Sequence, residues 1–322
     1  DDMRTRFAGC DGQIIEVLVG AAGCSPYLKT LAEKEGDWLI YAFDDPEMAI
    51  EDLFETLPDC PRDALSVTLR QAKRRVALLA GLADLAGVWT LEEVTQILTR
   101  FADVAVTVAL RATIGQEIRR GKLPGFTEQD LPSSGAMTVL AMGKMCAGEL
   151  NYSSDIDLIC LFDETRFETD DYHDARASLV RATRQMTAML SDKTAEGYVF
   201  RTDLRLRPDP SVTPVCMAMT AAETYYESLG RTWERAAYIK ARVAAGDAVS
   251  GARFLKALTP FVWRRHLDFA AIQDAHDMRL RIREHKGLGG GIVLAGHNMK
   301  LGRGGIREIE FFTQTRQIIA GG

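Results

Sequence analysis

The sequence lacks the residue patterns of several common protein classes. None of its six cysteines forms a C-x-x-C pair, and its five histidines show no H-E-x-x-H or other zinc-ligand spacing. Scattered cysteines of this kind are typical of reduced, mostly buried thiols in a cytosolic protein. The sequence therefore does not predict a zinc enzyme or a disulfide-stabilised domain.

Long apolar runs and a basic surplus are also missing. No stretch approaches the roughly 20 apolar residues that a membrane-spanning helix needs, and the first residues do not have the form of a signal peptide. Lys and Arg number 39 against 45 Asp and Glu, so the net charge is −6, whereas nucleic-acid-binding proteins usually carry a basic surplus. We expect a cytoplasmic protein that binds neither a membrane nor nucleic acid.

What is present is a chain of 322 residues, 47% hydrophobic and 26% charged, which suits two or three globular domains. Residues 1–130 are predicted to be helical. An apolar stripe at helical spacing runs through residues 61–85, and it consists of Leu65, Leu69, Ala72, Val76 and Leu79. A capping box at 90–93 begins a second helix that ends at 119 or 120. We interpret this region as a helical scaffold without chemistry of its own, followed by a linker at 122–134.

Residues 135–215 have the character of strands with one helix between them. The short apolar runs at 136–142 and 158–162 are typical of buried strands, and a helix is predicted over 174–190. Residues 198–207 alternate with period two, which predicts a strand with Asp203, Arg205 and Arg207 on one face. A second capping box is predicted at 220–223, and the pattern from there to the end is helical.

Two aspartates begin the second apolar strand. Asp155 and Asp157 point to the same face because side chains alternate along a strand, and two such charges repel each other unless a cation lies nearby. Asp203 supplies a third carboxylate if its strand lies beside theirs. Three carboxylates around one or two Mg²⁺ ions are the site that phosphoryl and nucleotidyl transfer require. The sequence thus predicts that these three aspartates are metal ligands and catalytic residues.

Small and basic residues near the aspartates predict contacts with nucleotide or phosphate. The predicted set consists of Gly143 and Lys144 in a turn, Ser154 where the strand begins, and Arg205 and Arg207 beside Asp203. A lone Asp-x-Asp is more often a solvated strand edge. Here a glycine turn, two apolar strands and a third aspartate among arginines accompany it, and this combination favours a site.

Longer strings in the chain carry a specific resemblance. A glycine followed after eleven residues by Asp-Ile-Asp, with a later carboxylate, resembles the nucleotidyltransferases of the DNA polymerase β type. The chain from about residue 20 onward is similar to the bacterial glutamine synthetase adenylyltransferase/adenylyl-removing family, through the strings GKMCAGELNYSSDIDLICLFD, GYVFRTDLRLRP, GRTWERAAYIKAR, PFVWRRHLDF and KLGRGGIREIEFFTQ.

The resemblance implies a fold, a reaction and partners. The fold is α+β, with a mixed nucleotidyltransferase-type sheet at 131–250 between helical regions at 1–130 and 251–322. The string from Glu149 to Asp157 is closer to the N-terminal half of the family than to the C-terminal half. This implies phosphorolytic removal of AMP from a tyrosine of glutamine synthetase, with release of ADP. Mg²⁺ (or Mn²⁺), ADP or ATP, and phosphate are the implied cofactors and substrates. Glutamine synthetase and the PII signalling protein are the implied partners.

Two other functions remain open, and the chain departs from the family at one turn. The alternatives are forward adenylylation of glutamine synthetase with ATP and a catalytically silent module that binds nucleotide or PII. Cys146 and Ala147 stand where the family usually has glycine, so we expect a more restricted turn near the phosphate and a slower reaction.

Several further motifs allow two interpretations. Arg231, Arg235 and Arg242 are placed on one side of a predicted helix, where ion pairing and contact with nucleotide are equally plausible. The glycine-rich residues 302–310 are interpreted as a tight turn rather than an anion site. Packing is predicted for Cys146 and Cys160, and surface charge for Arg264, Arg265 and His266.

Overall fold

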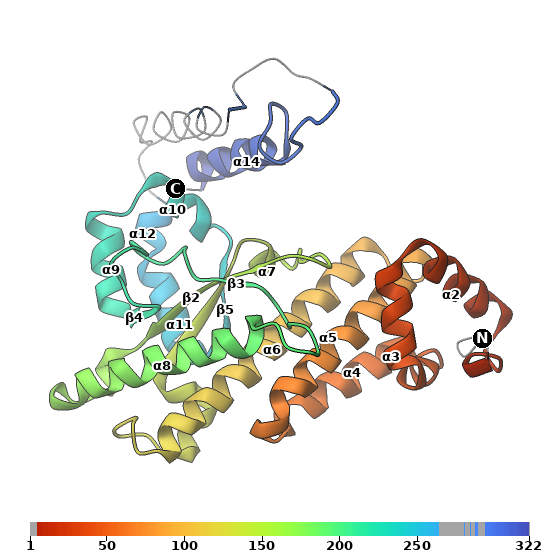
Figure 1. The fold of residues 1–322 in the computed structure, drawn as a ribbon. Helices are drawn as coiled ribbons and strands as arrows, with labels where there is room; N and C mark the ends of the chain where they lie inside the picture. Colours follow the sequence, from red (N-terminus) through yellow and green to blue (C-terminus); the bar gives the residue numbers. More distant parts are fainter. Residues whose placement is uncertain (1–4, 264–279, 281–283, 285–286, 289–293, 322) are drawn as a thin grey trace.

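The computed structural model describes residues 5–263, 280, 284, 287–288 and 294–321 (Figure 1). The chain begins with a helical region that consists of α2 (Gly12–Cys24), α3 (Pro26–Ala42), α4 (Pro46–Thr56), η1 (Leu57–Asp59), α5 (Arg62–Leu85) and α6 (Leu91–Arg119). Asp11, Ser25 and Asp45 cap α2, α3 and α4 by accepting a hydrogen bond from an N–H in the first turn. The prediction of a helical first third is confirmed.

The two long helices agree closely with the sequence pattern. All five residues of the predicted stripe on α5 are buried. Thr90 and Glu93 form the predicted capping box of α6, in which the Glu93 carboxylate accepts the Thr90 N–H at 2.6 Å. Among the helices that the structure describes, none combines the length and apolar character that a membrane span requires.

A mixed sheet of five strands follows the helical region. It contains β1 (Met137–Met142), β2 (Ile156–Phe162), β3 (Thr202–Asp203), β4 (Cys216–Ala218) and β5 (Ala241–Gly246), with α8 (Tyr172–Ser191) between β2 and β3. The strand order is β3-β2-β1-β5, and β4 also pairs with β2. β1 is antiparallel to β2 and β5, whereas β3 and β4 are parallel to β2. The predicted α+β class and mixed sheet are confirmed.

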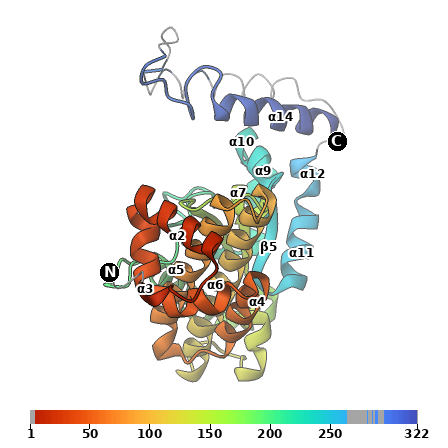
Figure 2. The ribbon, with the colours of Figure 1, turned by 90° about the vertical axis from the view of Figure 1, so that its right-hand side faces the viewer.

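Alternate residues of the sheet enter two different cores. Ile156, Leu158 and Cys160 of β2 belong to a cluster that includes α5, α6 and α8. Ile159 and Leu161 belong to a second cluster with α9 (Met219–Ser228), α10 (Thr232–Tyr238), α11 (Ala248–Ala257) and α12 (Thr259–Val262). Figure 2 shows β5 between the helical region and α11. Asp157 lies on the second face, because it alternates with Ile156 and Leu158.

The shorter elements connect these layers. They are η2 (Glu128–Ala136), α7 (Gly143–Ala147), η3 (Glu164–Arg166), η4 (Thr169–Asp171) and α14 (Ile306–Ala320). The predicted linker at 122–134 contains most of η2. Before α14, the N–H of Gly305 donates to the carbonyl of Gly302 at 3.0 Å, so residues 302–310 begin with the tight turn that was predicted. Arg264, Arg265 and His266 lie outside the described residues.

The predicted strand at 198–207 is wrong except for β3. After Asp203 the chain turns, and the Arg207 guanidinium donates to the carbonyls of Leu204 (2.8 Å), Pro210 (2.9 Å) and Thr213 (3.2 Å). Before Thr202, the N–H groups of Val199 and Phe200 both donate to the carbonyl of Leu190 at the end of α8. These partners satisfy backbone groups that a ladder would otherwise use, so the alternating pattern does not become a long strand.

The prediction of uninterrupted helix after residue 220 is also wrong. Residues 241–246 read ARVAAG, an alanine-rich string that suits a helix, but pairing with β1 makes it β5, with Arg242 opposite Ala141. The capping box at 220–223 does not form, because α9 already begins at Met219. The Glu164 carboxylate instead accepts the N–H groups of Met219 (3.1 Å) and Thr220 (3.0 Å), so a distant segment caps this helix.

Candidate active site

The three predicted aspartates lie on neighbouring backbone where β2 and β3 begin. β3 is parallel to β2, with Ile156 opposite Thr202 and Asp157 opposite Asp203. Neighbouring strands are roughly 4.8 Å apart, so the two carboxylates are borne by adjacent backbones. Asp155 directly precedes β2 and accepts the side chain of Arg201. The condition for a three-carboxylate cluster, that the strand of Asp203 lies beside that of Asp157, is therefore met.

Asp157 has the most perturbed carboxyl group of the three. Its pKa is raised to about 6, mainly by burial and additionally by the negative charges of Asp203 and Asp155, while Arg205 and Lys300 partly oppose the shift. Because the Asp157 carboxylate is difficult to ionise beside two other carboxylates, a nearby cation would stabilise its charged form. This electrostatic coupling distinguishes the cluster from a solvated strand edge.

Asp203 has the opposite electrostatic environment. The Arg205 side chain donates to both of its carboxylate oxygens, with Nη2 2.5 Å from Oδ2 and Nε 3.0 Å from Oδ1. These hydrogen bonds hold the pKa of Asp203 below its ordinary value. The Arg205 side chain is 82% exposed, so it can also reach a ligand in solvent.

Arg201 is a site residue that the sequence reasoning missed. Its Nε donates to Asp155 Oδ1 at 2.5 Å, Nη2 to the carbonyl of Ser153 at 2.7 Å, and Nη1 to the hydroxyl of Tyr198 at 2.9 Å. The available signal was the alternation of the sequence, which places Arg201 on the same strand face as Asp203, two residues later. The partner Asp155 is 46 positions away, and no local pattern indicated the pair.

Gly143 brings a backbone turn close to Asp157. Its φ is +55°, in the left-handed region, and a Cβ built there would lie 3.5 Å from Asp157 Oδ2. Gly148 ends α7 with φ +73°. Cys146 and Ala147 have no positive φ and lie in the helical part of the turn. The expected restriction of φ at these two positions is therefore wrong, since the turn requires left-handed residues only at its two ends, whereas the slower reaction stays a prediction.

The remaining residues predicted to contact nucleotide or phosphate differ in their exposure and in their hydrogen-bond partners. The Lys144 side chain is exposed on α7. Ser154 donates from Oγ to Asn151 Oδ1 at 2.8 Å and closes the turn before β2. The guanidinium of Arg207 is engaged by its own loop, so Arg205 is the arginine best placed to contact a ligand. Cys160 is buried, as expected of a packing residue, and burial raises the pKa of the half-buried Cys146.

The arginines of the 231–242 string have separate positions. Arg231 precedes α10, Arg235 is buried within it, and Arg242 lies on β5, so they do not share one helix face. Arg242 pairs with Asp103 at 2.8 Å, which supports the ion-pair interpretation for that residue.

The cluster suits a divalent cation in donor type and in charge. Within the described ranges, no three Asp, Glu, His or Cys side chains stand together as a ready metal-ligand set, and arginines engage Asp155 and Asp203. All the donors are carboxylate oxygens, which Mg²⁺ and Mn²⁺ prefer. A cation shared by the aspartates would also offset the repulsion that raises the pKa of Asp157. Both oxygens of Asp203 and Oδ1 of Asp155 are engaged by arginines, so a cation would compete with Arg205 and Arg201 for them.

A mixed sheet with a glycine turn after its first strand, and with aspartates on two parallel neighbours, defines a nucleotidyltransferase-type protein. Comparison with known sequences narrows this class. The chain belongs to the family described as glutamate-ammonia ligase adenylyltransferase, whose sequence model matches residues 15–257. A second model, described as GlnD PII-uridylyltransferase, matches residues 275–322. The family resemblance is confirmed.

Curated relatives cover nearly the whole chain. Three relatives are named bifunctional glutamine synthetase adenylyltransferase/adenylyl-removing enzyme. The protein of Bradyrhizobium sp. (strain BTAi1) is 47% identical to this chain, and those of Agrobacterium fabrum and Caulobacter vibrioides are each 45% identical. Each match covers 95% of this chain but only 31–32% of the relative. The chain therefore spans about a third of the length of these relatives.

Proposed function

We propose that the chain removes AMP from adenylylated glutamine synthetase by Mg²⁺-dependent phosphorolysis, which gives unmodified glutamine synthetase and ADP. The observation that carries the proposal is the cross-strand pair of Asp157 and Asp203, with Asp155 before it and Gly143 beside it. The names of the relatives include both transfer and removal of the adenylyl group. The string from Glu149 to Asp157 favours removal for this chain.

The aspartates and Arg205 have distinct roles in this mechanism. Asp155, Asp157 and Asp203 would hold the cation, and Mn²⁺ could replace Mg²⁺. When bound, the ion neutralises phosphate oxygens and stabilises the leaving oxygen. Arg205 orients the incoming phosphate through two N–H groups, and Gly143 leaves room for the phosphate chain because it has no side chain.

The chemistry requires no strong general base. An oxygen of inorganic phosphate bonds to the α-phosphorus while the bond from that phosphorus to the tyrosyl oxygen breaks, so ADP forms directly. The tyrosine leaves as a phenolate, whose conjugate acid has a pKa of about 10, and takes a proton from solvent. The acceptor is already an anion, so positioning and charge neutralisation account for the catalysis.

The same proposal assigns two protein partners. Glutamine synthetase is the substrate, and the PII signalling protein is the regulatory partner. The match of residues 275–322 to a PII-uridylyltransferase model supports the second assignment.

The test is release of ADP from adenylylated glutamine synthetase by this chain in the presence of phosphate and Mg²⁺. We expect Asp155→Asn to reduce the rate at least 10³-fold, because removal of a cation ligand removes most of the charge stabilisation. Asp170→Asn, which changes an exposed aspartate of η4, is the matched control and should keep the full rate.

Two outcomes would replace the proposal with its alternatives. Transfer of label from ATP to unmodified glutamine synthetase, without phosphorolysis, would assign the forward reaction. Absence of both reactions and of Mg²⁺ or Mn²⁺ binding, with retained binding of nucleotide or PII, would assign a regulatory module.

A further inference from the structure

The turn beside Asp157 is held in place by a segment almost 100 residues away. We call residues 143–149, which comprise α7, Gly148 and Glu149, the glycine turn. Residues 240–242, where β5 begins, contact it at both ends. The carbonyl of Lys240 accepts the N–H of Gly143 at 3.1 Å, and Lys240 Nζ lies 3.0 Å from Glu149 Oε2.

Arg242 contacts the middle of the glycine turn from the same side. Its Nη2 donates to the carbonyl of Met145 at 2.9 Å, and its Nε donates to the carbonyl of Cys146 at 3.2 Å. These carbonyls belong to the end of a five-residue helix, where a cation is favourable, and the Met145 carbonyl also accepts the N–H of Gly148 at 3.5 Å.

Asp103 fixes the guanidinium in this position. Nη2 of Arg242 lies 2.9 Å from Asp103 Oδ1 and 2.8 Å from Oδ2, and Asp103 belongs to α6. The side chain of Arg242 therefore joins three elements: the long helix of the helical region, the edge strand β5 and the glycine turn. Neither the proposed chemistry nor the metal ligands account for this arrangement.

We infer that Arg242 is a positioning residue, which acts through the carbonyls of Met145 and Cys146 to hold the glycine turn against Asp157 and thereby sets the affinity for nucleotide. The inference rests on the proposed function, because it takes the glycine turn to border the nucleotide phosphates. Its structural part is independent: Arg242 orders residues 143–149 whether or not a nucleotide binds.

The expected effect follows from preorganisation. Without the guanidinium, the turn samples other conformations, and nucleotide binding must then select the ordered one. The dissociation constant rises by the reciprocal of the ordered fraction, whereas groups that contact the nucleotide directly are unchanged.

Arg253 provides a matched control. Its Nη2 lies 2.5 Å from Asp163 Oδ2, so it also forms a short ion pair with an aspartate at the sheet. Asp163 follows the last residue of β2, at the opposite end of that strand from Asp157. Loss of this pair should affect stability without affecting the glycine turn.

The experiment measures ADP binding by titration calorimetry with Mg²⁺ for the wild type, Arg242→Met, Arg242→Lys and Arg253→Met. We expect the dissociation constant to rise about tenfold in Arg242→Met and less than twofold in Arg253→Met. Arg242→Lys should restore only part of the affinity. Its ammonium keeps the positive charge but cannot reach Asp103 and both carbonyls at once. Amide hydrogen exchange should be faster at residues 143–149 in Arg242→Met only.

Equal loss of affinity in Arg242→Met and Arg253→Met, or unchanged exchange in the glycine turn of Arg242→Met, would overturn the inference. If Arg242→Met does not fold, Asp103→Asn takes its place, with an expected rise of about threefold in the dissociation constant. A wild-type chain that does not bind ADP contradicts the proposed function instead, and hydrogen exchange still decides whether Arg242 orders the turn.

Discussion

The helix pair α5–α6 and the segment 192–215 both carry a clear periodic pattern, yet only the helix pair follows it. In α5 and α6 the apolar stripe, the capping box and the boundaries agree with the sequence. In residues 192–215 a ten-residue alternation yields a two-residue strand, β3. The difference lies in how each backbone satisfies its hydrogen bonds. A helix uses its own, whereas this segment depends on partners elsewhere in the chain.

Helix α5 supplies several of those partners. Arg70 is fully buried, and it donates to the carbonyls of Gly197 (2.8 Å) and Asp192 (2.6 Å). Arg74 pairs with Glu196 at 2.6 Å. The helical region therefore does more than the passive scaffold that its composition suggests. Through these contacts, α5 holds in place the segment in which Arg201 and Asp203 lie.

Among the predicted changes in stability, replacement of Arg70 should have the largest, because residues 192–197 depend on its hydrogen bonds. We expect Arg70→Met to lower the free energy of unfolding by about 4 kcal/mol, because the guanidinium is fully buried and its hydrogen bonds to the carbonyls of Gly197 and Asp192 are lost. Urea denaturation measures the loss, and hydrogen exchange should increase at residues 192–201. Arg100→Met, which breaks the exposed pair of Arg100 with Glu51, is the control and should change stability by less than about 0.5 kcal/mol. Similar losses in both variants would contradict the role of Arg70.

A core substitution in α6 should have a slightly smaller effect and spare the site. Leu110 is completely buried, so Leu110→Ala should lower the free energy of unfolding by about 3 kcal/mol. ADP affinity should stay within twofold of the wild type when measured well below the melting temperature. Leu91→Ala at the 69% exposed start of the same helix should be nearly neutral. A large loss of ADP affinity in Leu110→Ala would show that the helix pair and the site are not separable in this way.

The smallest change in stability that we predict concerns Asp157. Its replacement should stabilise the chain, whereas Arg70→Met and Leu110→Ala should destabilise it. Burial and two neighbouring charges raise its pKa in the folded chain to about 6 from 3.8, so the ionised group opposes folding. The stability that protonation provides is complete below about pH 4 and is lost as the pH rises through 6. After a reduction for solvent screening, Asp157→Asn should raise the free energy of unfolding by about 1–2 kcal/mol at pH 7.5 and abolish activity.

Asp203→Asn is the informative comparison for this prediction. The pKa of Asp203 is held below its ordinary value by Arg205, so its charge favours folding and its loss should destabilise the chain at pH 7.5. Urea denaturation between pH 5 and 7.5 measures both variants. Destabilisation by Asp157→Asn at pH 7.5 would mean that Asp157 is not the strained member of the cluster.

The parts of the fold that were predictable share one property. Helices α5, α6 and α8, and strands β1 and β2, are long or strongly apolar, so local pattern and tertiary context agree. Strand β5 was missed because its alanines suit a helix and only its pairing with β1 makes it a strand. The cap of α9 was misplaced for a similar reason, since Glu164 lies 55 residues before the Met219 N–H that it binds.

The candidate site divides in the same way. The sequence sufficed to predict that the strand of Asp203 lies beside that of Asp157, whereas the role of the three aspartates as metal ligands stays a prediction. Arg201 and Arg242 were not assigned their positions, because each acts on a partner far away in the sequence, Asp155 and Asp103. Left-handed backbone at Gly143 and Gly148, and not at Cys146, likewise depends on how the turn closes.

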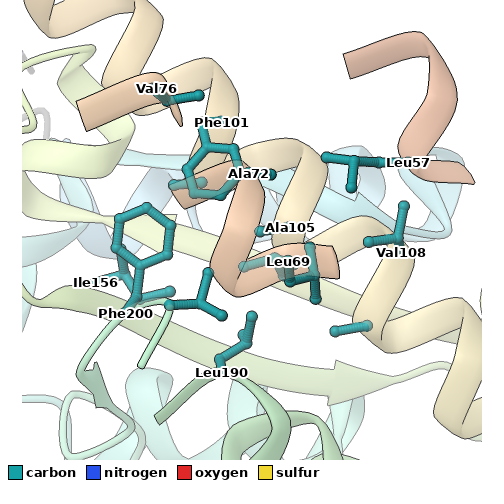
Figure 3. Packing of buried hydrophobic residues seen from close by; sticks show 14 of the residues in the cluster. Leu57, Leu69, Ala72, Val76, Phe101, Ala105, Val108, Ile156, Leu190 and Phe200 are labelled. Carbon is teal, nitrogen blue, oxygen red and sulfur yellow. The ribbon is translucent and has the colours of Figure 1, made fainter. Parts of the chain in front are cut away.

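The buried cluster that joins the helical region to the sheet has a thermodynamic consequence. Ile156, next to Asp157, and Phe200, next to Arg201, pack in the same core as Leu69 and Phe101, and the rings of Phe101 and Phe200 lie 5.5 Å apart (Figure 3). Residues that share a core tend to unfold as one cooperative unit. A ligand bound to the aspartate cluster would therefore raise the melting temperature of helices that do not touch it, and the buried indole of Trp89 would report that melting by its fluorescence.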